Sequence, residues 1–183
     1  MLYLATADGR PPAKLAPMRV LGIDCGGEYT GYGVVEQDDS GALHHLCSGA
    51  IHLAPREALE LRLKKICEGL HAIISAHSPE QVAIEDVFYA VNAKSALKLG
   101  HVRGVAMLVA AQAGLAVVAY SPLSIKSSVV GYGRAEKSQV QFMVARLLSL
   151  PAPPEPPDAA DALAIAICHL HTSGTLQRQA AGR

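Results

Sequence analysis

Four carboxylates lie where an apolar segment of this chain meets a turn or the start of a helix: Asp24, Glu85, Asp158 and Asp161. A carboxylate at the edge of a hydrophobic element is partly desolvated, and several close together repel one another unless protons or cations neutralise them. Mg²⁺ prefers hard oxygen ligands and keeps open positions for water and phosphate. The four acids therefore predict a magnesium active site, in which repulsion holds the carboxylates farther apart when metal is absent.

Each acid alone also has an ordinary structural explanation. Asp24 precedes Gly26 and is typical of a turn, and Glu85 can be a solvated strand end. Asp158 can cap a helix, and the helix dipole favours both Asp158 and Asp161. However, residues 159–168 are so apolar that their helix is expected to be buried, and a buried acidic pair needs a partner cation. The joint placement of the acids indicates a metal site.

Basic residues are concentrated in one part of a chain whose formal net charge is zero. Residues 89–146 contain seven basic residues and one acidic residue, which favours a surface that holds phosphates. Phe88 beside lysines can stack on an unpaired base, although a core position is its common alternative. The candidate nucleic-acid contacts are Phe88, Tyr89, Asn92, Lys94, Lys98, Arg103, Lys126, Arg134 and Lys137.

The remaining candidate ligands point to structural roles. The four cysteines are scattered without a CxxC pair, which favours free thiols in a reducing cytosol and disfavours zinc. We expect structural roles for His101, His169 and His171. The most apolar stretch, 104–120, is interrupted by Gln112 and Gly114, so we predict a cytoplasmic protein that is neither secreted nor membrane-spanning.

Hydrophobic periodicity predicts a single α/β domain over residues 18–172, between a flexible leader (1–17) and a disordered tail (173–183). We expect strands at 19–25, 30–36, 42–53, 81–85 and 116–120, and helices at 56–77, 95–113, 135–150 and 158–172. The first three strands form an antiparallel meander, and strand and helix then alternate. The predicted fold is ribonuclease H-like, a five-stranded mixed sheet with an antiparallel meander and parallel strands, flanked by helices.

Four segments together resemble the bacterial RuvC Holliday-junction resolvases in order and spacing: LGIDCGGEYTGYGVVE, VAIEDVFYAVNAKSALKLGHVRG, VVGYGRAEKSQVQFMV and PPDAADALAIAICHLH. The resemblance implies a homodimer that nicks a four-way DNA junction symmetrically and works with the branch-migration proteins RuvA and RuvB. It places the four acids in the magnesium site, Phe88 on a base near the crossover, and Lys126 and Lys137 near the cleaved strand. Such resolvases usually carry Pro where this chain has Cys25, which should loosen the turn slightly.

The chemistry expected from this resemblance is phosphodiester hydrolysis with two Mg²⁺ ions, for which Mn²⁺ is a possible substitute. Asp24 would bridge the ions, and the products would carry 5′-phosphate and 3′-hydroxyl ends. One alternative is an ATPase of the actin and sugar-kinase type, because GIDCGGEYTG also resembles its first phosphate loop, but such proteins need two related domains. The others are a junction-binding module that does not cut and the ribosomal-RNA-processing branch of the superfamily.

Overall fold

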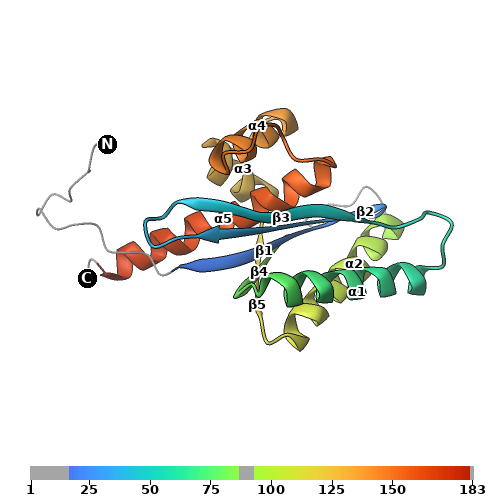
Figure 1. Ribbon diagram of the computed structural model, residues 1–183. Coiled ribbons are helices and arrows are strands. Elements are labelled where there is room, and N and C mark those ends of the chain that lie inside the picture. Colours follow the sequence, from blue (N-terminus) through green and yellow to red (C-terminus); the bar gives the residue numbers. More distant parts are fainter. Residues whose placement is uncertain (1–16, 87–92, 182–183) are drawn as a thin grey trace, which may run out of the picture.

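A computed structural model describes residues 17–86 and 93–181 of the protein. The elements, in chain order, are β1 (Met18–Cys25), β2 (Tyr29–Gln37), β3 (Leu43–His52), α1 (Leu59–His77), β4 (Gln81–Glu85), α2 (Ala93–Gln112), β5 (Ala116–Tyr120), α3 (Pro122–Val130), α4 (Lys137–Leu147) and α5 (Pro157–Ala181) (Figure 1). Of the predicted leader, only Pro17 lies within the described residues. No helix among the described residues is both long enough and apolar enough to cross a membrane.

The strands form one five-stranded sheet in the order β3-β2-β1-β4-β5. β2 is antiparallel to both β1 and β3, whereas β4 is parallel to both β1 and β5. Short turns suffice for the antiparallel strands, but the parallel strands require the helical crossovers α1 and α2. The predicted five-stranded mixed sheet with flanking helices is confirmed.

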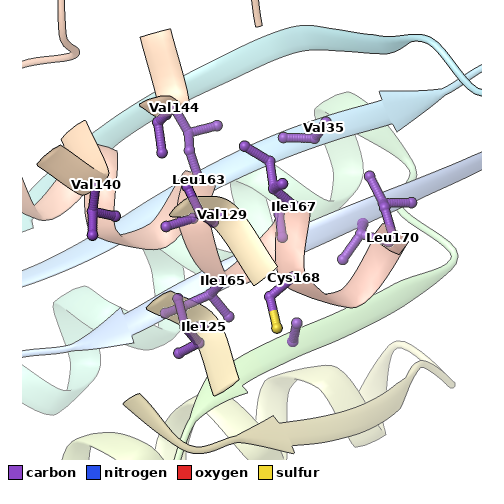
Figure 2. Close-up of a cluster of buried hydrophobic side chains, with 14 of the residues drawn as sticks. Val35, Ile125, Val129, Val140, Val144, Leu163, Ile165, Ile167, Cys168 and Leu170 are labelled. Atoms are coloured by element: carbon purple, nitrogen blue, oxygen red, sulfur yellow. The ribbon is translucent and has the colours of Figure 1, made fainter. Parts of the chain in front are cut away.

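Helices cover both faces of the sheet: α3, α4 and α5 lie on one side, and α1 and α2 on the other (Figure 1). Alternate strand residues therefore enter two cores. Val20 and Ala83 pack towards α5, while Leu21 and Ile84 pack towards α1 and α2. Figure 2 shows the core on the α5 side of the sheet, where side chains of α3, α4 and α5 pack together. They are Ile125 and Val129 of α3, Val140 and Val144 of α4, and Leu163, Ile165 and Ile167 of α5.

α5 lies directly on the sheet because glycines of β1 and β2 leave room for its backbone. A Cβ on Gly22 would lie 2.0 Å from the Ala162 carbonyl oxygen, and one on Gly31 would lie 2.1 Å from that of Asp158. Every residue of the helix from 159 to 170 is buried except Asp161. This close packing places the acidic start of α5 against the end of β1.

The sequence pattern did not predict α3. Ser121 caps this helix by accepting a hydrogen bond from the Ser124 amide at 3.1 Å, and Pro122 follows at the first helical position. Gly131, with φ 98°, ends the helix in the left-handed conformation that glycine adopts readily. The Ser-Pro pair is a known helix-start signal, and it was available in the sequence.

The predicted end of the last helix at Thr172 is wrong, because α5 continues to Ala181, into the segment for which the sequence predicts a disordered tail. The polar residues of this segment remain compatible with a helix. The hydroxyl of Thr172 donates to the Cys168 carbonyl at 2.8 Å, and that of Thr175 donates to the His171 carbonyl at 2.8 Å. These bonds satisfy side-chain hydroxyls within the helix, so polarity alone did not predict its end.

Candidate active site

Two of the predicted acids lie at the ends of neighbouring parallel strands. Asp24 is the penultimate residue of β1 and Glu85 is the last residue of β4. Since Ile23 pairs with Ile84 in the parallel register, the next residues, Asp24 and Glu85, leave the sheet side by side. Both side chains are half-buried on the face that α5 covers.

A pocket of about 200 Å³ joins these acids to the start of α5. Its lining consists of Asp24, Glu85, Pro122, Ile125, Lys126, Lys137, Val140, Asp161, Ala164 and Ile165. The fourth acid, Asp158, does not line the pocket, and its Oδ1 is 3.8 Å from the position that a Cβ on Gly26 would occupy. Three of the four predicted acids therefore share one pocket, and the fourth is near the turn that follows Asp24.

The carboxylates act on one another electrostatically. Burial and then the negative charges of Asp161, Glu85 and Asp158 raise the pKa of Asp24 from 3.8 to about 7, against a lowering by Lys137. Burial and the charge of Asp161 also raise the pKa of Glu85, while Lys126 and Lys137 lower it. The pocket thus concentrates negative charge that attracts cations.

The carboxylates do not form a compact ligand set. Within residues 17–86 and 93–181, no group of three or more His, Cys, Asp or Glu side chains is arranged to hold a metal ion. Instead, the Lys137 ammonium lies 2.6 Å from Asp161 Oδ2 and supplies a positive charge. The hydrogen bond with Asp161 raises the pKa of Lys137. The fourfold acidic donor set suits a hard divalent cation, and the metal site stays a prediction.

Two predicted lysines reach the pocket from different helices. Lys126 is half-buried on α3, and Lys137 begins α4. α4 starts with a capping box in which the Glu136 amide donates to Gln139 Oε1 at 2.9 Å. α3 and α4 therefore place two ammonium groups next to the acids, although the residues are eleven positions apart in the sequence.

The other predicted nucleic-acid contacts whose side chains the structure describes do not line the pocket, and they differ in exposure. Lys98 on α2 and Arg134 before α4 are exposed. Arg103 instead forms a 3.4 Å ion pair with Asp86 and is only 27% exposed. Lys94 is the second residue of α2, but its side chain lies outside the described part of the protein, as do the whole residues Phe88, Tyr89 and Asn92.

Sequence reasoning missed Arg62, which supports the loop that follows Asp24. The guanidinium of Arg62, on α1, donates a hydrogen bond to the Gly27 carbonyl oxygen. Arg62 occupies a polar position of an amphipathic helix, so no local pattern distinguished it from a solvated residue.

Cys25 packs in the core on the α1 and α2 side, and burial raises the pKa of its thiol to about 12. All four cysteines are free, as predicted.

The raised pKa of Asp24 predicts how the stability of the metal-free protein depends on pH. Its folded pKa of about 7 exceeds the 3.8 of an unperturbed carboxyl, so the folded state binds the extra proton and stability falls as pH rises from about 4 to 7. Asp24→Asn removes this dependence. We expect the stability of Asp24→Asn relative to wild type to increase by on the order of 2–3 kcal/mol between pH 5 and pH 8.

Urea denaturation in EDTA at the two pH values measures this difference. The control is Glu28→Gln, which changes an exposed carboxylate and should follow the wild type. If the free energy of unfolding of Asp24→Asn differed from that of the wild type by the same amount at both pH values, the assigned shift of the Asp24 pKa would be contradicted.

The comparisons with known proteins agree on one family. The family described as "Crossover junction endodeoxyribonuclease RuvC" matches residues 20–169. A protein of that name from Koribacter versatilis is 68% identical over 161 residues, covering 88% of this chain and 97% of the relative. Another, from Acidobacterium capsulatum, is 59% identical over 168 residues, covering 88% of this chain and 98% of the relative.

Solved structures show the same likeness. Thermus thermophilus RuvC is 33% identical, with a TM-score of 0.80, over 86% of this chain and 96% of the other. The T. thermophilus protein in complex with a Holliday junction substrate gives a TM-score of 0.82 with the same identity and coverage. The yeast mitochondrial Holliday junction resolvase has a TM-score of 0.61 at 14% identity, over 88% of this chain and 84% of the other, and shares the fold.

Proposed function

Because this chain belongs to the RuvC family of crossover junction endodeoxyribonucleases, we propose that it resolves four-way DNA junctions by paired, symmetric phosphodiester hydrolysis in recombination and repair. The observation that carries this proposal is the pocket at the ends of β1 and β4, where Asp24, Glu85 and Asp161 meet two lysines. Such a pocket combines groups that bind cations with groups that bind phosphate.

The proposed cofactor is Mg²⁺, two ions per site, with Mn²⁺ able to replace it. The ligands would be Asp24, Glu85, Asp158 and Asp161, all of which offer the carboxylate oxygens that Mg²⁺ prefers. When bound, the ions would activate water and stabilise the leaving oxygen of the 3′-hydroxyl product. The proposed central role of Asp24 among the ligands is supported by the charges of the other three acids, all of which raise its pKa.

The two lysines would hold the scissile strand. Lys137 is 60% exposed and bonded to Asp161, so its ammonium can turn from the carboxylate to a phosphate oxygen when cations neutralise the acids. Lys126 lines the same pocket from α3 and can bind the adjacent phosphate. Lys98 and Arg134 are exposed and would bind phosphates in the arms of the junction.

We also propose that the protein is a homodimer, because a two-fold symmetric junction needs two identical sites. The exposed face of α2 supports this. Leu97, Met107 and Leu108 are 64%, 40% and 56% exposed, and a Cβ on Gly100 or Gly104 would meet nothing within 4 Å. Their spacing of three to four residues makes one apolar helix face that suits a second copy of α2.

Leu108→Glu is expected to convert the dimer to a monomer and to abolish paired cutting, because it places a charge in the proposed interface. Sedimentation measures the mass, and a supercoiled cruciform plasmid reports whether both strands are cut in one binding event. Leu61→Glu, at a 50% exposed position on α1, is the matched control and should stay dimeric. An unchanged mass for Leu108→Glu would rule out this interface.

Substrate comparison tests the proposed function against its alternatives. The purified protein should cut a synthetic four-way DNA junction in Mg²⁺ and leave structured RNA intact. Preferred RNA cleavage would favour the ribosomal-RNA-processing branch, and binding without nicking under any divalent metal would favour a non-cutting module. ATP turnover without DNA would favour the ATPase.

We further propose that the protein works in the cytoplasm with RuvA and RuvB. Family membership supports this partnership, and a DNA substrate together with four free thiols suits the bacterial cytoplasm. Junction-dependent co-purification with RuvA and RuvB tests the partnership, and cell fractionation tests the location.

A further inference from the structure

Tyr120 and His169 form a hydrogen-bonded pair outside the pocket of the candidate active site. The Tyr120 hydroxyl lies 2.9 Å from His169 Nδ1, and the two rings meet edge to face with centroids 5.8 Å apart. His169 is only 4% exposed. The sequence suggested a structural role for this histidine but no partner for it.

The hydrogen bond to Tyr120 is the one polar contact of the His169 ring among the described residues. Burial lowers the pKa of His169 and raises the pKa of Tyr120, so both shifts favour the uncharged forms. The Tyr120 hydroxyl shares its hydrogen bond with His169 Nδ1, and it also meets the Thr172 side chain. His169 Nε2 is buried without a hydrogen-bond partner among the described residues, so loss of the bond to Tyr120 leaves the ring with no polar contact there.

Each end of this hydrogen bond belongs to an element that carries part of the site. Tyr120 ends β5, pairs in register with Glu85, and accepts a hydrogen bond on its carbonyl from the Asp86 amide at 2.8 Å. The next residue, Ser121, caps α3, which carries Lys126. His169 lies on α5, eight positions after Asp161. The pair therefore connects the β5–α3 corner to the helix that carries two of the acids.

We infer that Tyr120 and His169 are positioning residues of the nuclease site, whose hydrogen bond holds α5, and with it Asp161, in place relative to Glu85 and Lys126. This inference rests on the proposed function. Neither residue lines the pocket, so their effect passes through the elements that they join. A displacement of about 1 Å in a reacting group can slow catalysis by up to roughly 10²-fold, so a small shift of α5 matters.

Two kinds of substitution separate positioning from packing. Tyr120→Phe removes only the hydroxyl, and His169→Leu replaces the imidazole with an apolar side chain that cannot form the hydrogen bond. His169→Asn keeps a side chain that can donate to or accept from the Tyr120 hydroxyl. Tyr32→Phe is the matched control, because Tyr32 packs in the core on the opposite face of the sheet.

The measurements are single-turnover cleavage of a four-way junction in Mg²⁺ and the junction Kd in EDTA. Tyr120→Phe and His169→Leu should cut roughly tenfold more slowly with Kd within about twofold of wild type, and His169→Asn should recover most of the rate. The inference would be overturned if Tyr120→Phe cut at the wild-type rate, or if Tyr120→Phe and His169→Leu lost rate and affinity equally. It would also be overturned if His169→Asn recovered none of the rate lost in His169→Leu. A wild-type protein that does not cut would instead overturn the proposed function.

Discussion

Asp24→Asn is expected to lower the rate of junction cleavage by on the order of 10³-fold and to leave junction binding intact or slightly tighter. Burial and the charges of the three other acids raise the pKa of Asp24 to about 7. An amide has nearly the same shape but cannot carry the negative charge that a cation requires. Removing that charge also reduces the repulsion of DNA phosphates, so affinity should not fall.

Single-turnover kinetics in Mg²⁺ and binding in EDTA separate the two effects. Glu85→Gln should behave like Asp24→Asn, because Glu85 leaves the adjacent strand at the same edge of the sheet. Glu60→Gln changes an exposed carboxylate in the first turn of α1 and is the matched control, with wild-type cleavage. Near wild-type cutting by either Asp24→Asn or Glu85→Gln would show that the chemistry takes place elsewhere.

Gly22→Ala is expected to lower the free energy of unfolding by roughly 3 kcal/mol or more. The added Cβ would lie 2.0 Å from the Ala162 carbonyl oxygen and 2.8 Å from the Ala166 amide nitrogen. Both contacts are with the backbone of α5, so no side-chain rotation relieves them, and the helix must move off β1. Because Asp161 is on that helix, cleavage should also fall at temperatures where the variant is folded.

Urea denaturation measures the loss of stability. Gly27→Ala is the matched control, since its Cβ would meet nothing within 4 Å, and its stability should stay within about 1 kcal/mol of wild type. A loss for Gly22→Ala no larger than that of the control would show that α5 does not lie directly on β1.

Local sequence patterns predicted most elements because the residues that define each element are close together in the chain. The apolar runs at 81–85 and 116–120 agree with β4 and β5 at both ends, and the helical spacing of 56–77 predicted α1 to within three residues. The errors arose where polarity or short length hid a helix. α3 has nine residues, and the end of α5 is rich in hydroxyl side chains that bond to its own backbone.

The candidate site could be predicted only as a set of residues. The positions of Asp24 and Glu85 at strand ends, and of Asp158 and Asp161 at a helix start, follow from hydrophobic periodicity. Their electrostatic coupling does not, because it depends on how closely α5 approaches the sheet. Nor did composition distinguish Arg103, which is paired with Asp86, from Lys98, which is exposed.

By itself, the sequence determined the ribonuclease H-like order of elements, the four acids and the family resemblance, since each of these follows from residue type and spacing along the chain. The tertiary structure alone decided which charges neutralise one another and which side chains support the site. Lys137 meets Asp161, Arg62 meets the loop after Asp24, and Tyr120 meets His169. These partners are 24, 35 and 49 positions apart, so the packing of helices on the sheet, not local propensity, determines their distances.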